Sequence, residues 1–169
     1  MPKTINVLFL AAEAEPFVKV GGLGDVAGAL PRALRNLPAD VRGDSVLDVR
    51  LVLPHHSVIK AEARPLAIFP LERNGQDVTV QVSEATLDGM PVYLLGGGPI
   101  TSVGGVYSSN PALDAEKYSF FSLAALELPR VLNWNVDILH AHDWHTALAV
   151  YALLLKRWAG GMAGTASVL

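Results

Sequence analysis

The apolar positions of the chain follow two different periods. Residues 5–11 form an almost unbroken apolar run, which is typical of a strand buried on both faces. Val26, Leu30 and Leu37 then recur at helical spacing and predict a helix over residues 24–36. Further strands are expected at 46–53, 137–141 and 165–169, and further helices at 118–132 and 144–158. This alternation predicts an α/β fold, in which a mostly parallel, Rossmann-like sheet carries helices on both faces.

The middle of the chain departs from this alternation. Three short β segments are expected there, at residues 66–71, 78–82 and 92–95. The first two are separated by Asn74-Gly75 and the last two by Asp88-Gly89, which are residue pairs preferred in tight hairpin turns. We therefore expect antiparallel hairpins to be added to the parallel sheet.

Glycine and proline shape the next part of the chain. Residues 96–111 are rich in Gly, Ser and Pro and predict a long loop, which in a compact domain is usually functional or mobile. Pro129 lies within the helix expected at 118–132 and predicts a kink or a split near Leu128.

The C-terminal segments are strongly apolar. The helix at 144–158 is expected to be buried on most of its surface, and the strand at 165–169 to be a buried core strand. No turn residue or polar tail follows that strand, so we expect the chain to be cut within a domain, with the missing part beyond Leu169. No internal repeat or interdomain linker is evident, which predicts one domain over residues 1–169.

Composition narrows the class of protein. The chain has 169 residues, 51% of them hydrophobic and 17% charged, with a formal net charge of −3, which argues against disorder and against a nucleic-acid-binding patch. It has no cysteine, so it has neither disulfides nor thiolate metal sites. The first apolar run is too short for a signal peptide, and the most apolar helical stretch is about half a membrane span. We expect a cytoplasmic protein that does not associate with membranes.

A glycine-rich segment follows the first strand and carries Lys19, Gly21, Gly22, Gly24 and Asp25. Backbone amides without side chains, a helix N-terminus and a lysine together favour binding of a phosphate. The alternative is a glycine turn that only precedes the helix. Asp25 has two interpretations as well, as a helix cap or as a contact to a sugar hydroxyl.

The spacing argues against two common nucleotide motifs. A P-loop needs Gly-Lys-Ser/Thr leading into the helix, whereas Lys19 precedes the glycines. Gly22, Gly24 and Gly28 contain one residue too many for the dinucleotide fingerprint. The acidic residue expected after the second strand is also missing, because Pro54 and a histidine stand there.

A second cluster, His140-Ala141-His142-Asp143-Trp144-His145, follows a strand near the C-terminus, where ligands bind in open α/β sheets. The His-x-His pair places two rings on one face and permits a metal site, with Asp143 or His145 as a further ligand. Structural histidines with Asp143 capping the next helix are a second possibility. A substrate cleft, in which imidazoles and a carboxylate bind hydroxyl groups, is the third.

Both motifs together resemble the bacterial glycogen synthases and plant starch synthases, the ADP-glucose-type enzymes of glycosyltransferase family 5. The resemblance is carried by residues 7–26, 29–31, 51–55 and 137–148, in the same order along the chain. It implies a retaining glucosyltransferase of the two-domain GT-B architecture. Residues 1–169 would be its N-terminal, acceptor-side domain, and the C-terminal donor-binding domain would be absent.

The family resemblance also implies a reaction and its partners. The full enzyme would transfer glucose from ADP-glucose to the non-reducing-end 4-hydroxyl of an α-1,4-glucan, without a metal or other cofactor. The chain alone is expected to be inactive because half of the donor site would be missing. Tyr107 would help to hold the donor, and Val20 stands where the family usually has threonine.

Six further positions receive roles from the resemblance. Lys19 would contact the donor diphosphate, and Gly21 and Gly22 would let the backbone close over it. Asp25 would face the cleft near the donor. Asp143 would lie beside the transferred glucose, supported there by His142, and these two would be the catalytic residues.

Two alternatives to a synthase domain follow from the residues themselves. One is a stand-alone, non-catalytic module that binds α-glucan. The other is a metal-dependent hydrolase that uses His140-Ala141-His142.

Overall fold

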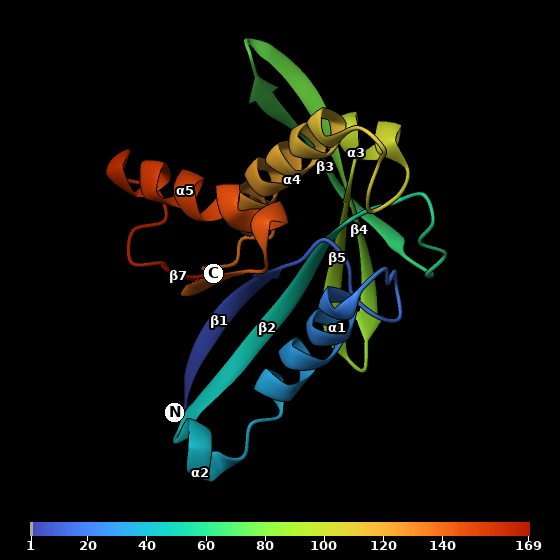
Figure 1. The fold of residues 1–169 in the computed structure, drawn as a ribbon. Coiled ribbons are helices and arrows are strands. Elements are labelled where there is room, and N and C mark those ends of the chain that lie inside the picture. The colour runs from blue at the N-terminus through green and yellow to red at the C-terminus, as the bar shows by residue number, and fades with distance from the viewer. Residues whose placement is uncertain (1) are drawn as a thin grey trace.

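The computed structural model describes residues 2–169, except for the side chains of residues 102 and 103. Seven strands in this part form one sheet in the order β3-β4-β5-β2-β1-β6-β7 (Figure 1). The strands are β1 (Lys3–Leu10), β2 (Ser45–Pro54), β3 (Arg64–Arg73), β4 (Gln76–Leu87), β5 (Met90–Gly96), β6 (Ile138–Ala141) and β7 (Ala166–Val168). The helices are α1 (Gly22–Arg35), α2 (Ala39–Arg42), α3 (Gly98–Val103), α4 (Pro111–Val131) and α5 (Trp144–Trp158).

The strands β5, β2, β1, β6 and β7 run parallel, as the alternating pattern predicts. Leu10 at the end of β1 is paired with Val52 of β2 on one side and with Ala141 of β6 on the other. The carboxyl ends of these three strands therefore meet at one edge of the sheet, which is where open α/β folds bind ligands.

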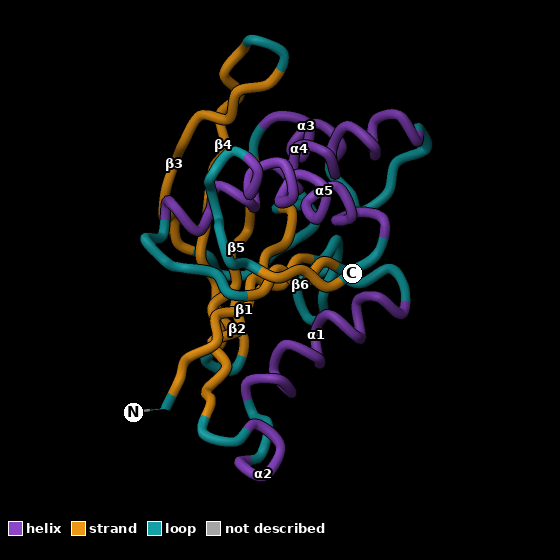
Figure 2. The backbone as a smooth tube through the Cα atoms, turned by 90° about the vertical axis from the view of Figure 1, so that its left-hand side faces the viewer, coloured by secondary structure: helices purple, strands orange, loops and turns teal. Residues whose placement is uncertain are grey.

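Helices cover both faces of the sheet, which confirms the expected fold class. Leu8 and Leu10 of β1 belong to a core with side chains of α4 and α5, whereas Val7 and Phe9 belong to a second core with Ala27 of α1. Successive strand residues point to opposite faces, so one apolar run supplies both cores. Figure 2 shows β1, β2 and β6 between α1 and the group formed by α3, α4 and α5.

The two predicted hairpins are confirmed. Asn74 and Gly75 have φ angles of 52° and 75°, and Asp88 and Gly89 have φ angles of 50° and 76°. Positive φ at both central residues matches the turn that suits the right-handed twist of paired strands. β4 pairs antiparallel with both β3 and β5, so the hairpins extend the parallel sheet on one side.

Two predictions about the segment after β5 were wrong in part. The expected loop at 96–111 contains α3, and α4 begins seven residues before the predicted start at 118. Asn110 caps α4 by accepting a hydrogen bond from the amide of Ala112 at 3.0 Å, with Pro111 as the first helical residue. α4 also continues through Pro129 without a split, and ends two residues later at Val131.

The C-terminal elements are less buried than predicted. α5 buries one side, including His145, Ala149 and Leu153, and exposes a second apolar side. The exposed apolar residues of α5 are Trp144, Tyr151, Leu154, Leu155 and Trp158. β7 is an exposed edge strand rather than a core strand. Among the helices of residues 2–169, none is both long and apolar enough to cross a membrane.

Candidate functional site

Three loops meet beyond the carboxyl ends of β1, β2 and β6. The His142 amide donates to the Leu10 carbonyl at 3.0 Å, which joins the loop after β6 to β1. Nε2 of the buried His56, which follows β2, lies 2.9 Å from the Ala12 carbonyl. Burial lowers the pKa of His56 to about 4, so the ring is neutral and donates this hydrogen bond. Both sequence motifs therefore lie at the same edge of the sheet.

The buried carboxylate of Glu13 shapes the glycine-rich loop. It accepts hydrogen bonds from the amide of Val20 and, at 3.2 and 3.3 Å, from the amide of Gly21. Only 1% of the Glu13 side-chain and backbone surface is exposed. The position of this acid directly after an apolar run was the only sequence signal for its role, and it was not recognised.

Lys19 extends from this loop into solvent and contacts two acids. Its Nζ donates to Asp25 Oδ1 at 2.5 Å and to Glu15 Oε2 at 3.3 Å. The hydrogen bond with Asp25 raises the pKa of Lys19 and lowers the pKa of Asp25. Lys19 is thus a charged, exposed ammonium that can exchange its carboxylate partners for another anion. Asp25 lies in the first turn of α1 but makes no capping hydrogen bond in the described structure, so the capping interpretation is wrong.

The glycines of the loop differ in what constrains them. A Cβ on Gly28 would lie 2.5 Å from the Glu15 carbonyl oxygen, and a Cβ on Gly24 would lie 2.9 Å from Lys19 Cγ. Neighbouring atoms of the protein therefore leave no room for a side chain at Gly24 or Gly28. A Cβ on Gly21 would come no closer than 3.7 Å to Glu13, and one on Gly22 would meet no described atom within 4 Å. Internal packing therefore does not explain Gly21 and Gly22.

The two histidines of β6 and the following loop lie on one face, as the His-x-His spacing predicts. Their rings are stacked with centroids 4.7 Å apart, and the ring of Phe9 lies 4.5 Å from His140 and 4.7 Å from His142. Burial lowers the pKa of both histidines. Nε2 of His142 is buried and has no hydrogen-bond partner among residues 2–169. No three His, Asp or Glu side chains in this range converge as metal ligands.

Asp143 connects β6 to α5 in an unusual backbone conformation. Its φ is 63° and its ψ is 178°, a region that costs a residue with a side chain about 1–3 kcal/mol. Its Oδ1 accepts a hydrogen bond from the Trp144 amide at 2.6 Å, so Asp143 caps α5. Its side chain is 52% exposed, and Oδ2 lies 3.9 Å from Nδ1 of His145. The carboxylate is thus directed to the sheet edge on a strained backbone, which marks a candidate functional position.

An aromatic cluster brings Tyr107 to this edge. His145 is buried, and its ring centroid lies 4.1 Å from that of Trp144, 4.6 Å from Tyr118 and 5.5 Å from Tyr107. Burial lowers the pKa of His145, and neither ring nitrogen has a hydrogen-bond partner in the described chain. Burial raises the pKa of Tyr107, and the carboxylates of Glu13 and Asp143 raise it further. Tyr107 therefore lies within electrostatic reach of both motif loops.

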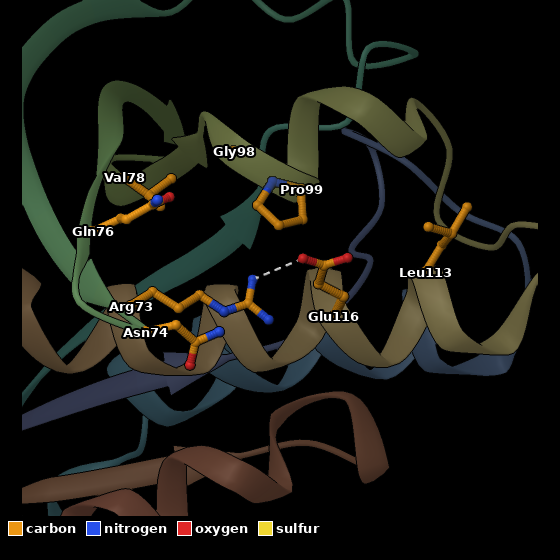
Figure 3. A pocket seen from close by; sticks show the side chains of 8 residues that line it. All are labelled: Arg73, Asn74, Gln76, Val78, Gly98, Pro99, Leu113 and Glu116. Atoms are coloured by element: carbon orange, nitrogen blue, oxygen red, sulfur yellow. Dashed lines mark hydrogen bonds and ion pairs between the residues drawn. The ribbon is translucent and has the colours of Figure 1, made fainter.

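A separate hollow lies away from these loops. Figure 3 shows it between the turn joining β3 to β4, the start of α3 and the first turns of α4. Arg73 and Glu116 form an ion pair at 3.1 Å across it. None of the predicted site residues lines this hollow.

The fold defines a Rossmann-like α/β domain, and its polar candidate site lies at the carboxyl ends of neighbouring parallel strands. Residues 6–169 match the family described as starch synthase catalytic domain. The chain is 37% identical over 158 residues to a glycogen synthase of Bacillus cereus (strain B4264), covering 90% of the chain and 31% of the relative. It is 36% identical over 162 residues to the glycogen synthase of Aliivibrio fischeri, covering 92% of the chain and 31% of the relative.

A solved structure is similar to this chain as well. The catalytic domain of starch synthase IV from Arabidopsis thaliana, bound to ADP and acarbose, superimposes with a TM-score of 0.80 at 27% identity. That match covers 97% of this chain and 33% of the other. The chain belongs to the starch synthase catalytic domain family, which confirms the resemblance found in the sequence. It spans about a third of the length of these relatives.

Proposed function

We propose that residues 1–169 form the N-terminal, acceptor-side part of a retaining glucosyltransferase of GT-B architecture. The full enzyme transfers glucose from ADP-glucose to the non-reducing-end 4-hydroxyl of an α-1,4-glucan. The observation that carries this proposal is the family match over residues 6–169, together with the meeting of both motif loops at one sheet edge. The related starch synthase IV was solved with ADP and acarbose bound, which supports a nucleotide and a sugar as ligands.

In this proposal, the glycine-rich loop binds the donor diphosphate. The ammonium of Lys19 leaves Asp25 and Glu15 and pairs with a phosphate oxygen. Gly21 and Gly22 leave space above the backbone at the start of α1, where the helix dipole favours an anion. Charge on the leaving diphosphate increases as the anomeric bond breaks, so these groups stabilise the transition state more than the bound donor.

The loop after β6 binds the transferred glucose. An oxocarbenium-like sugar carries positive charge, and the carboxylate of Asp143 offsets that charge. His142 has an unpartnered Nε2 that can bind a sugar hydroxyl and so orient the glucose beside Asp143. Tyr107, which is 45% exposed, contributes a ring face and a hydroxyl to the same site.

A second domain completes the donor site. The curated relatives are about three times as long as the matched segment. The chain also exposes an apolar side of α5 and the edge strand β7, surfaces that a further part of such an enzyme would cover. We expect residues 1–169 alone to transfer no glucose from radiolabelled ADP-glucose to glycogen. Robust transfer by this chain would refute the need for a second domain.

Amide NMR titrations of the chain test the ligand assignments even at millimolar affinity. ADP is expected to shift the amides of Gly21 and Gly22, and Lys19→Ala is expected to abolish those shifts. Lys60→Ala, at another exposed lysine, is the matched control and leaves them unchanged. If ADP shifts no amide of this loop in the wild-type chain, the diphosphate role of Lys19 is wrong.

The stand-alone α-glucan-binding module is retained as the second candidate. The exposed rings of Tyr107 and Trp144 at the sheet edge favour it, because aromatic faces can stack on sugars. In the same titrations, shifts with maltooligosaccharides and none with ADP or ADP-glucose would select the module over the synthase domain. We propose a cytoplasmic location for either protein, which the lack of cysteine in residues 1–169 fits.

A further inference from the structure

The segment that carries Tyr107 has no regular secondary structure, yet it is tied to α4 by a buried lysine. Lys117 lies on the first half of α4, and none of its surface is exposed. Lysine is almost never fully buried unless it is paired, because its charge loses hydration. Its surroundings therefore indicate what the buried charge does.

The ammonium of Lys117 has a complete set of partners. Its Nζ donates to the Gly105 carbonyl at 2.9 Å, to the Val106 carbonyl at 2.5 Å and to Asp114 Oδ1 at 3.2 Å. A lysine has three donors, so all of them are used. Two of the three acceptors are consecutive carbonyls directly before Tyr107.

Two neighbours on the same helix hold the other parts of this segment. Asp114 accepts the amide of Ser108, directly after Tyr107, at 3.1 and 3.0 Å. The hydroxyl of Tyr118 donates to the Val106 carbonyl at 2.6 Å. Spacings of three and four residues place Asp114, Lys117 and Tyr118 on one face of α4. The chain is thus held on both sides of Tyr107.

The buried ion pair of Lys117 and Asp114 is better explained by a role in positioning the loop than by a contribution to stability. Burial lowers the pKa of Lys117, and Asp114 opposes this shift. Burial would raise the pKa of Asp114, but hydrogen bonds from Ser108 and Lys117 lower it overall. Replacing such a buried pair by apolar side chains is often neutral or stabilising, so the pair is weak evidence for stability. What it supplies is a defined position for an otherwise irregular loop.

We propose that Asp114, Lys117 and Tyr118 are positioning residues that hold Tyr107 against His145 at the candidate donor site. This rests on the proposed function of Tyr107. Tyr118 serves twice, because its hydroxyl holds Val106 while its ring packs edge-on against His145 and Trp144. We call these three residues the α4 clamp.

Amide hydrogen exchange tests the clamp without any ligand. Lys117→Met removes the ammonium and keeps most of the side-chain length. It is expected to speed exchange of the Ser108 amide by about tenfold, because Asp114, which accepts that amide, loses its charged partner and the carbonyls of Gly105 and Val106 lose their donor. Amides of β1 and β2 are expected to keep their rates. Lys117→Arg is expected to restore part of the protection. Arg130→Met, at an exposed arginine that pairs with Glu127 on the same helix, is the control and leaves the loop unchanged.

Unchanged exchange at Ser108 in Lys117→Met would overturn the clamp. If Lys117→Met does not fold, Tyr118→Phe removes one hydroxyl and must still speed exchange of the segment around Val106, or the proposal is wrong. ADP titrations then test the link to function, with affinity expected to fall about tenfold in Lys117→Met and to stay unchanged in Arg130→Met. If the wild-type chain does not bind ADP, the proposed function fails, and the exchange rates still decide the clamp.

Discussion

Asp143→Gly is expected to stabilise the protein although it removes a helix cap. Asp143 has φ 63° and ψ 178°, a region that is accessible essentially only to glycine. Glycine relieves strain of about 1–3 kcal/mol. Against this, the glycine variant loses a few tenths of a kcal/mol of stability because glycine is a weaker helix cap. It loses about 0.4–1 kcal/mol more because glycine gives the unfolded chain more conformational entropy. The net gain is about 1 kcal/mol, taking the middle of the strain range.

Two further variants at the same position separate strain from capping. Asp143→Ala keeps the strain and loses the hydrogen bond to the Trp144 amide, so it is expected to destabilise by about 1 kcal/mol. Asp143→Asn keeps an oxygen that can cap and is expected to be close to neutral. Urea unfolding gives the free energies, and the glycine variant should also melt about 2–4 °C higher.

The strain reasoning would be refuted if Asp143→Gly were no more stable than Asp143→Ala. If the expected order is found, it has a functional consequence. A side chain that costs stability where glycine would serve must be retained for what its carboxylate does. In the full-length enzyme, Asp143→Gly is therefore expected to lose glucose transfer while gaining stability.

Two other predictions concern pH and the glycines. Burial lowers the pKa of His56 to about 4, against 6.5 in the unfolded chain, so unfolding takes up a proton and stability falls as the pH drops from 6.5 to 4. Between pH 7 and pH 5, the free energy of unfolding measured in urea should fall by about 2 kcal/mol because of His56. In His56→Gln the free energy of unfolding should depend less on pH. An equal pH dependence in both proteins contradicts the low pKa assigned to His56. Gly28→Ala should destabilise the protein by about 3 kcal/mol, because the new Cβ meets the Glu15 carbonyl. Gly22→Ala should change the stability by less than about 0.5 kcal/mol, but it should weaken the amide shifts that ADP induces. Similar unfolding free energies for the two glycine variants would contradict the distinction.

Local pattern predicted most of the elements. The apolar run of β1 and the helical spacing of α1 needed no tertiary information, and the Asn-Gly and Asp-Gly turns gave both hairpins. The start of α4 was missed although Asn110 and Pro111 are typical of a helix N-terminus. The burial of α5 could not be predicted from its composition, since exposure depends on which elements pack against it.

The candidate site was predictable as two motifs but not as one arrangement. Both motifs were placed at strand ends, yet only the strand order shows that β1 lies between β2 and β6. Glu13 and Lys117 were missed for one physical reason. Charged residues are normally read as surface positions, whereas the burial of these two depends on backbone groups of irregular segments, 7 residues away for Glu13 and 12 residues away for Lys117.

The charges at the sheet edge argue that this chain binds a diphosphate only weakly by itself. Lys19 is the cation of the glycine-rich loop, and it is paired with the carboxylates of Glu15 and Asp25, while the carboxylate of Glu13 binds two amides of the same loop. Asp143 adds a further carboxylate on the neighbouring loop, and the ammonium of Lys117 is fully occupied by the α4 clamp. A diphosphate carries several negative charges, so its binding here needs positive charge from another part of the enzyme. We therefore expect weak, salt-sensitive binding of ADP to residues 1–169, which supports a donor site shared between two domains.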